Sequence, residues 1–195
     1  MISPRCGDPT TGEETRLDVR SRDLDMPQER FAALEKFPLY LVLDNLRSAF
    51  NVGSIFRSAD TARLAGVITC GYTAHPPHPR LEKTALGALD YVPHEHFDKT
   101  VEAIASLTAR GIAVWAMETT SQSRPYHEVS YPQPLALVLG NEALGVEREV
   151  LGTCDGIVEV PVFGYKNSLN VACVAAVVVF EALRQWGFEP GLTRA

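Results

Sequence analysis

Short apolar runs that alternate with amphipathic segments constrain the fold of this chain most. Residues 39–43, 67–72 and 135–139 carry no charged side chain, and residues 51–65 place apolar side chains at helical spacing. Strands that are apolar on both faces are typical of a parallel sheet covered by helices on its two sides. The sequence therefore predicts an α/β fold, with a mostly parallel sheet and helices on both faces.

The same reasoning places the other elements and the domain boundary. Predicted strands cover residues 39–43, 67–72, 112–117, 135–139 and 157–160. Predicted helices cover residues 27–36, 51–65, 99–109, 147–154 and 169–186. Residues 1–25 are polar, with mixed charge and no periodicity, so we expect an N-terminal arm followed by one domain over residues 26–195.

The last predicted helix is the most apolar segment of the chain. Residues 171–180 carry no charge, and Glu181 ends the run. The run is too short to span a bilayer. Because it is apolar nearly all round, it has to be buried on more than one side. A sheet covers one side, so we infer that a second subunit covers another and that the protein is a homodimer.

Composition limits the class of protein. The first residues lack an apolar secretory segment, and the four cysteines have no metal-binding spacing, so we expect a cytoplasmic protein with no membrane span. Cys70 and Cys173 fall in apolar segments and are expected to be buried. A net charge of −6 argues against a general nucleic-acid binder, so any RNA contact needs a local basic patch.

The first polar loop joins a predicted strand to a predicted helix over residues 44–57. Asn51 is a candidate N-cap, and Gly53 allows a close approach to the backbone. Arg57 lies opposite the apolar stripe and three residues before Asp60. From local sequence alone, an exposed ion pair between these two is the simpler interpretation.

Two further polar loops follow apolar strands. Residues 140–145 read Gly-Asn-Glu-Ala-Leu-Gly, without the spacing of a dinucleotide fingerprint or a P-loop. Residues 163–170 contain Lys166, and place Ser168 and Asn170 where they can cap the last helix. Loops at the carboxyl ends of parallel strands are where an open α/β sheet binds ligands. We therefore expect a ligand site between these two loops.

The histidines predict no metal site. His75, His78, His94 and His96 have no cysteine or carboxylate at zinc-like spacing. The chain also lacks a Gly-x-Ser-x-Gly nucleophile elbow, so acyl transfer has no support.

Taken together, the three loops resemble the SpoU/TrmH family of SPOUT methyltransferases. The family's Asn-x-Gly-x-Ile-x-Arg motif matches residues 51–57, and its Gly-x-Glu-x-x-Gly motif matches residues 140–145. Its third motif, a proline and a glycine loop that lead into Ser-Leu-Asn-Val, matches residues 161–171. The three occur in the family's order, and the resemblance covers roughly residues 38 to 187.

The resemblance implies more than periodicity could reveal. It implies a C-terminal trefoil knot, a rare exception to ordinary topology. It also implies a homodimer whose active site is shared across the interface. The cofactor would be S-adenosylmethionine, bound in the knot, and the reaction would be methylation of a ribose 2′-hydroxyl in tRNA or rRNA. No metal is needed, because the sulfonium methyl group is already activated.

The resemblance also assigns roles to residues. The implied catalytic residues are Arg57, Asn51, Glu142, Ser168 and Asn170. The implied cofactor-binding residues are Gly140, Val160 and Leu169, with Met117 and Glu118 as further candidates. The implied RNA-binding residues are Arg47, Arg80, Lys83 and Lys166. Arg57 either takes the proton from the ribose hydroxyl or stays charged and holds a phosphate, and the sequence leaves both roles open.

Three other functions stay open at this point. A SPOUT relative could methylate a base nitrogen, or could bind RNA without catalysis. An unrelated α/β protein could bind a small molecule. The intact motif over residues 51–57 and the residues 168–170 argue against base methylation. The presence of Arg57, Glu142 and Asn170 argues against a loss of catalysis. The third alternative would require three motif matches to be coincidental. No separate RNA-binding domain is expected before the catalytic one, so RNA selection would rest on the arm, the catalytic loops and the dimer groove.

Overall fold

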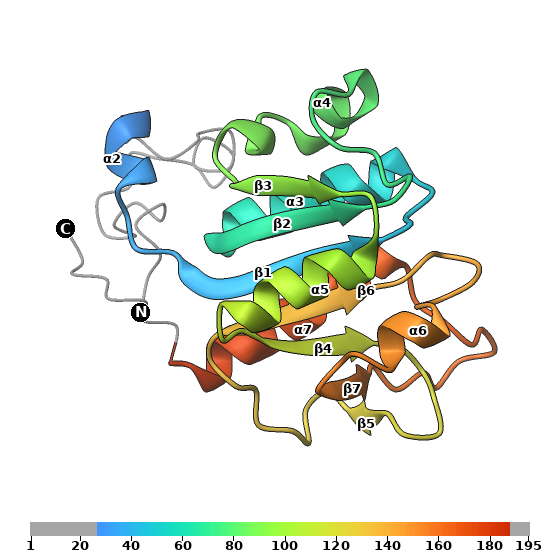
Figure 1. The fold of residues 1–195 in the computed structure, drawn as a ribbon. Coiled ribbons are helices and arrows are strands. Elements are labelled where there is room, and N and C mark those ends of the chain that lie inside the picture. The colour runs from blue at the N-terminus through green and yellow to red at the C-terminus, as the bar shows by residue number, and fades with distance from the viewer. Residues whose placement is uncertain (1–26, 188–195) are drawn as a thin grey trace, which may run out of the picture. The chain divides into compact units, whose positions relative to one another are not determined.

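Every strand pairing in the central sheet is parallel. The structure is a computed structural model, which describes residues 27–187. Its seven strands are β1 (Phe37–Asp44), β2 (Leu64–Cys70), β3 (His94–Phe97), β4 (Ala113–Met117), β5 (Arg124–Pro125), β6 (Leu135–Leu139) and β7 (Gly156–Glu159). They lie in the order β3-β2-β1-β6-β4-β7-β5 (Figure 1). The predicted parallel sheet is therefore confirmed.

Two edge strands were not predicted from the sequence. β3 is polar and mostly exposed, and β5 contains only two residues. Neither has the apolar run that identifies a buried strand. They are the two outermost strands of the sheet, where one face or one edge meets solvent.

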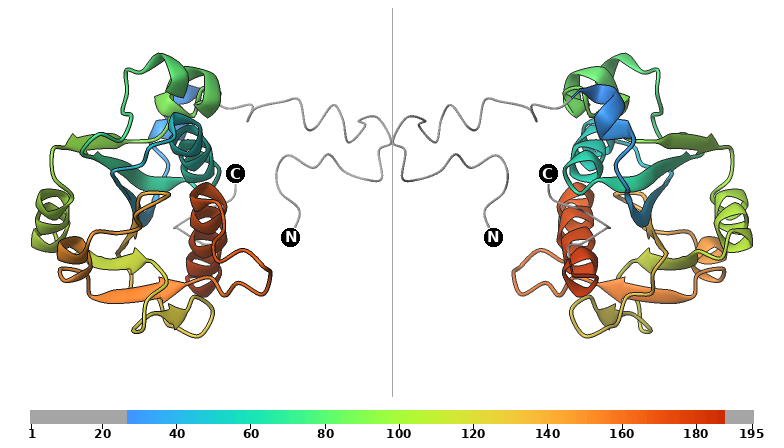
Figure 2. Two further views of the ribbon diagram at one scale, coloured as in Figure 1. Left: turned by 90° about the vertical axis from the view of Figure 1, so that its right-hand side faces the viewer. Right: turned by 90° about the vertical axis from the view of Figure 1, so that its left-hand side faces the viewer.

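Helices cover both faces of the sheet, as predicted. They are α3 (Ala49–Thr61), α4 (Pro79–Ala85), α5 (Thr100–Ala109), α6 (Arg148–Leu151) and α7 (Val171–Gln185), with a 3-10 turn at Ala88–Asp90. One further helix, α2 (Gln28–Ala32), comes before the first strand in the chain. Figure 2 shows α3 and α7 on one face and α5 and α6 on the other. The trefoil knot that the resemblance implies stays a prediction.

The chain divides into two units, residues 1–34 and residues 35–195. In the first, the described residues form α2, whose N-cap is Pro27. The second contains the sheet and the remaining elements. The predicted arm over residues 1–25 lies outside the described residues.

The two faces of the sheet carry separate apolar clusters. Leu41 and Leu43 of β1 face α3 and α7, whereas Val42 faces α5. Successive strand residues point to opposite faces, so a sheet covered on both sides needs apolar residues at every position. This explains why β6 is buried along its whole length.

The α3 helix differs at both ends from its prediction. Ser48 is its N-cap, because the Ser48 hydroxyl accepts a hydrogen bond from the Asn51 N–H at 3.3 Å. The prediction of Asn51 as the cap was wrong, and the Asn51 side chain is left available for other contacts. The helix ends at Thr61 because Arg63 adopts a left-handed φ of 49° and Leu64 already pairs with β1.

Gly53 is buried where α3 meets α4. A Cβ atom there would collide with the Thr84 side chain. The close approach that this glycine permits is therefore that of a neighbouring helix. The contact fixes the position of α4, on which Arg80 and Lys83 are exposed.

The α7 helix begins at its predicted cap and leaves one side uncovered in the single chain. The Asn170 carboxamide oxygen accepts a hydrogen bond from the Ala172 N–H at 2.9 Å. Cys173, Val177 and Phe180 are exposed, so the prediction that Cys173 is buried was wrong for the single chain. None of the helices within residues 27–187 has the length and apolarity that a membrane span requires.

Candidate active site

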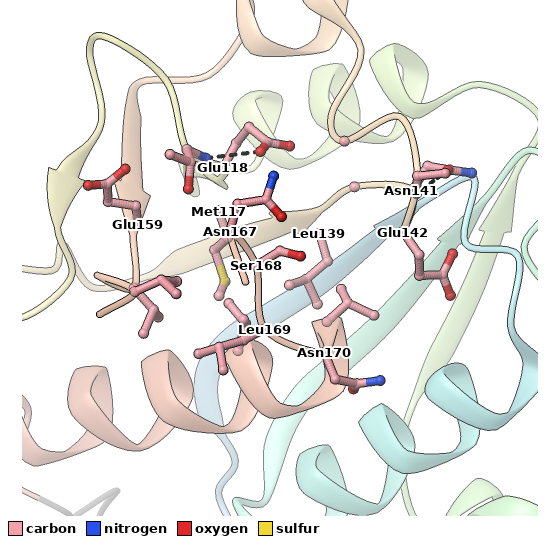
Figure 3. Close-up of a pocket in the computed structure, with 18 of the residues that line it drawn as sticks. Met117, Glu118, Leu139, Asn141, Glu142, Glu159, Asn167, Ser168, Leu169 and Asn170 are labelled. Atoms are coloured by element: carbon pink, nitrogen blue, oxygen red, sulfur yellow. Dashed lines mark hydrogen bonds between the residues drawn. The ribbon is translucent and has the colours of Figure 1, made fainter. Parts of the chain in front are cut away.

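A cavity of about 850 Å³ opens at the carboxyl ends of β4, β6 and β7, beside the start of α7 (Figure 3). The lining includes seven residues that the resemblance named, which are Asn51, Gly140, Glu142, Val160, Ser168, Leu169 and Asn170. Met117 and Glu118 line it too. Segments separated by more than a hundred residues in the chain thus meet at one site.

Glu142 joins the first and second motif loops. Its carboxylate accepts hydrogen bonds from the Arg47 N–H at 2.8 Å, the Ser48 N–H at 3.1 Å and the Asn51 Nδ2 at 2.8 Å. Partial burial raises the pKa of the Glu142 carboxyl. The bonds from Arg47, Asn51 and Ser48 outweigh that effect together and hold the pKa below its ordinary value.

Asn51 extends this network to the third motif loop. Its Oδ1 accepts a hydrogen bond from Asn170 Nδ2 at 3.0 Å, while its own Nδ2 donates to Glu142. The Oδ1 atom of Asn170 caps α7, because it accepts the hydrogen bond from the Ala172 N–H. The chain of bonds Glu142–Asn51–Asn170 therefore fixes the orientation of both amides and ties all three motifs together at the cavity.

We expect Glu142→Gln to lower stability in a pH-dependent way. The folded-state pKa of Glu142 is lowered, so its hydrogen bonds contribute stability above the unfolded-state pKa of about 4.3, and that contribution is lost as the pH falls through the folded pKa. At pH 7 the variant should lose about 1 kcal/mol, because a neutral amide has one acceptor oxygen in place of two. Urea unfolding at pH 7 and at pH 3 measures the difference.

Glu149→Gln, at an exposed position of α6, controls for the loss of one negative charge. The Glu142→Gln difference should shrink at pH 3, while the control should stay near wild type at both values. An equal loss at both pH values would contradict the assigned charge-assisted bonds.

The rim of the cavity is built around Gly140. A Cβ atom at this position would collide with the backbone of Gly145 and Val146. The Glu118 carboxylate holds the same turn, since it accepts the Val146 N–H at 2.8 Å and the Thr119 N–H at 2.9 Å. Apolar side chains line another part of the wall, namely Met117, Leu139, Val158, Val160, Leu169 and Val174. This combination of size, apolar wall and backbone polar groups suits an adenosyl group.

The basic residues that the resemblance named do not line the cavity. Arg57 is exposed on α3, about two turns from Asn51. Arg47 is exposed beside Glu142, to which its backbone is bonded. Lys166 is exposed in the loop that carries Ser168, whereas Arg80 and Lys83 are exposed on α4.

Sequence reasoning missed Asn141, which is buried between the motif loops. Its Nδ2 donates to the Asn45 carbonyl at 2.8 Å and to the Tyr72 hydroxyl at 2.6 Å. Its Oδ1 accepts the N–H groups of Ala143 and Leu144. The Gly-Asn pair in a polar loop is a signal for such a side-chain-to-backbone turn.

The histidines near β3 form a stacked pair, His75 on His96, with ring centroids 3.9 Å apart. Burial lowers the pKa of His96, and the charge of His75 lowers it further. Within residues 27–187 no three His, Cys, Asp or Glu side chains are grouped so that they could hold a metal ion.

The sequence of this chain is similar to those of known RNA methyltransferases. A model of the SpoU rRNA Methylase family matches residues 38–180. The chain is 32% identical over 154 residues to the 23S rRNA (guanosine-2′-O-)-methyltransferase RlmB of Vibrio parahaemolyticus. This match covers 78% of this chain and 62% of that protein. It is 33% identical to the tRNA (guanosine(18)-2′-O)-methyltransferase of Thermus thermophilus, and the match covers 75% of each. The chain thus spans less than two thirds of the length of RlmB.

Solved structures agree with these matches. The A. aeolicus TrmH/SpoU tRNA modifying enzyme superposes with a TM-score of 0.74 at 25% identity, over 86% of this chain and 88% of that one. The SpoU methyltransferase AviRb from Streptomyces viridochromogenes, in complex with the cofactor AdoMet, superposes with a TM-score of 0.72 at 28% identity, over 83% and 65%.

Proposed function

This chain belongs to the SpoU rRNA Methylase family, and on that premise we propose that it methylates a ribose 2′-hydroxyl of tRNA or rRNA with S-adenosylmethionine. The observation that carries the proposal is the Glu142–Asn51–Asn170 network, because it brings all three motifs to one cavity. Relatives with both rRNA and tRNA in their names support ribose as the target and leave the RNA class to experiment.

We assign cofactor binding to the cavity. The apolar side chains of Val160 and Leu169 would hold the adenine, and backbone groups beside Gly140 would hydrogen-bond its polar atoms. Bound there, S-adenosylmethionine supplies an electrophilic methyl group. The AdoMet complex of AviRb supports this assignment.

Arg57 is proposed to act from outside the cavity. A ribose hydroxyl has to lose its proton as its oxygen attacks the methyl carbon. Arg57 is exposed, so a phosphate of the RNA can reach its guanidinium from solvent. We assign it the electrostatic role, in which it holds that phosphate beside the reacting ribose and stabilises the developing negative charge. In this role the hydroxyl proton would pass to solvent water, and the neutral thioether of the spent cofactor would be the leaving group. Asn51 and Glu142 would position the ribose, and Ser168 would bind it from the third loop.

We also propose a homodimer formed in part through α7. The exposed side chains of Cys173, Val177 and Phe180 follow one another at intervals of four and three residues, so they form one apolar stripe on the helix. A second copy of the chain would bury this stripe. Sedimentation of the wild type and of Phe180→Glu tests the proposal, since the charge should favour monomers.

Methyl transfer to RNA tests the proposed function directly. Tritiated S-adenosylmethionine is supplied with tRNA and rRNA fractions from cells that lack this protein, and the label is mapped by nuclease digestion. Label in a 2′-O-methylnucleoside supports the proposal and identifies the RNA class. Label in a base would replace it with base methylation. Absence of both label and cofactor binding, by calorimetry, would favour a non-catalytic RNA-binding relative.

We expect Asn170→Asp to separate capping from catalysis. Aspartate caps a helix as well as asparagine does, so the melting temperature should stay close to that of the wild type. The variant loses the Nδ2 group that donates to Asn51. We expect kcat to fall about 10-fold, which is the change that corresponds to the free energy of one hydrogen bond. Asn170→Ala should lose the cap as well, at a cost of about 1 kcal/mol. Full activity of Asn170→Asp would mean that this residue is only a cap.

A further inference from the structure

The aromatic ring of Tyr72 is exposed to solvent, although its hydroxyl group and its backbone N–H group are both hydrogen-bonded. The residue is 62% exposed and lies just after the carboxyl end of β2. The Tyr72 hydroxyl accepts a hydrogen bond from Asn141 Nδ2 at 2.6 Å, and the Tyr72 N–H donates to Asn45 Oδ1 at 3.3 Å. An exposed ring held in this way cannot be explained as core packing.

The turn that carries the ring is fixed by its neighbours. Thr73 is buried, and its hydroxyl donates to the Leu43 carbonyl at 3.0 Å and accepts the Leu46 N–H at 2.9 Å. Gly71 has a φ of 60°, and a Cβ atom there would collide with the Asn45 side chain. The Asn45 N–H also donates to the Cys70 carbonyl at 3.4 Å, so the segment that carries Tyr72 is bonded to residues 43–46 on both of its sides. The ring is therefore held in a preorganised position.

The ring lies next to the candidate active site. Asn141 lines the cavity and bonds the Tyr72 hydroxyl, and the adjacent residue Glu142 bonds Asn51. Arg47 is exposed in the loop after β1, two residues after Asn45, which bonds Tyr72. Arg80 and Lys83 are exposed on α4, the helix that follows Tyr72 in the chain. Single-stranded RNA binds exposed aromatic rings by base stacking and exposed basic side chains by phosphate contact.

We propose that the Tyr72 ring is a stacking platform for a nucleobase of the RNA substrate, at or next to the nucleotide whose ribose enters the cavity. This inference rests on the proposed function, because the ribose is taken to be the reacting group. A base is attached directly to that ribose, so a flat apolar surface close to the cavity rim holds the nucleotide in place. Tyrosine suits this role because its two side-chain torsions leave little entropy to lose.

Four variants test the inference. Tyr72→Ala removes the ring, and Tyr72→Phe removes only the hydroxyl, whose partner Asn141 keeps its bond to the Asn45 carbonyl. Lys83→Ala removes a charge proposed to contact phosphate. Tyr91→Ala removes another partly exposed ring, before β3 at the amino edge of the sheet. Filter binding measures the affinity of each variant for unmodified tRNA and rRNA-fragment transcripts over a range of salt concentrations.

We expect Tyr72→Ala to weaken RNA binding about 10- to 100-fold, which is the loss of affinity that corresponds to the stacking free energy of one base. Tyr72→Phe and Tyr91→Ala should bind as the wild type does. The slope of log affinity against log salt should be unchanged in Tyr72→Ala and should fall by about one in Lys83→Ala. S-adenosylmethionine affinity, measured by calorimetry, should be the same in all four variants.

Three results would overturn the inference. Tyr72→Ala could bind RNA like the wild type. Tyr72→Phe could be as weak as Tyr72→Ala, which would mean that the residue acts only through Asn141. Tyr72→Ala could dissociate a dimer in sedimentation, which would make the ring a subunit contact.

Methyl transfer by the wild type separates this inference from the proposed function. A wild type that methylates RNA, beside a Tyr72→Ala variant with normal RNA affinity, defeats the stacking role alone. A wild type that binds RNA with a Tyr72 dependence and transfers no methyl group defeats the proposed reaction alone. A wild type that binds neither transcript defeats both.

Discussion

Replacement of Arg57 by alanine is expected to lower kcat for methyl transfer about 10²- to 10⁴-fold at saturating RNA. The guanidinium is the motif residue that we assign to stabilise charge at the reacting hydroxyl. Arg57 is exposed on α3, on the side of the helix away from the buried Val52, Ile55 and Phe56, so its removal leaves no cavity. The melting temperature should therefore stay near that of the wild type while activity falls.

Two comparisons sharpen this experiment. Arg57→Lys keeps the charge and loses the planar fork that binds phosphate through two bonds, so it should recover only part of the rate. Arg148→Ala, at an exposed position of α6 on the opposite face of the sheet, should keep full activity. Full methyl transfer by Arg57→Ala at saturating RNA would show that the catalytic assignment is wrong.

Gly140→Ala is expected to damage both stability and cofactor binding. The new Cβ atom would meet backbone atoms of Gly145 and Val146, which cannot rotate away as a side chain can. Overpacking of this kind costs about 1–3 kcal/mol, or roughly 3–10 °C in melting temperature for a chain of this size. The turn that Glu118 holds would have to move, and it forms the cavity rim. Calorimetry with S-adenosylmethionine should show at least a roughly 10-fold loss of affinity, about 1.4 kcal/mol.

Gly152→Ala is the matched control for this change. Gly152 has a helical φ of −67°, and the nearest atoms to an added Cβ are at ordinary contact distances of 3.4 Å and more. We expect it to leave stability unchanged or slightly raised, because alanine restricts the unfolded chain more than glycine does. Normal cofactor affinity in Gly140→Ala would contradict the role of this rim in binding.

The sequence predicted the central part of the fold well and its margins poorly. The apolar runs of β1, β2, β4 and β6 were identified because burial on both faces leaves few polar positions in a strand. β7 was identified from a shorter apolar run, although only Val158 in it is buried. The short helix α4 and the edge strand β3 were missed, because neither carries a long apolar pattern. The limits of α3 were misplaced because they depend on the Ser48 cap and on where Leu64 joins the sheet.

Some residues of the candidate site were predicted from the sequence and others were found only in the structure. Motif resemblance named Asn51, Glu142 and Asn170, and in the structure Asn51 is hydrogen-bonded to both of the others. It did not name Asn141, whose importance comes from bonds to residues about 70 and 96 positions away in the chain. Arg57 was named as catalytic from its motif, and its position outside the cavity appears only in three dimensions.

The sequence by itself determined the parallel α/β sheet and the three motif loops, and it gave Asn170 as one of two candidate caps for α7, because each of these depends on local spacing or on burial of a contiguous segment. Only the tertiary structure decided which partners those loops have. Four features join segments that are distant in the chain. They are the hydrogen bond that Asn51 donates to Glu142, the one that Asn170 donates to Asn51, the contact of Gly53 with α4, and the bond of Asn141 to Tyr72. Such contacts depend on strand order and register, which local periodicity does not encode.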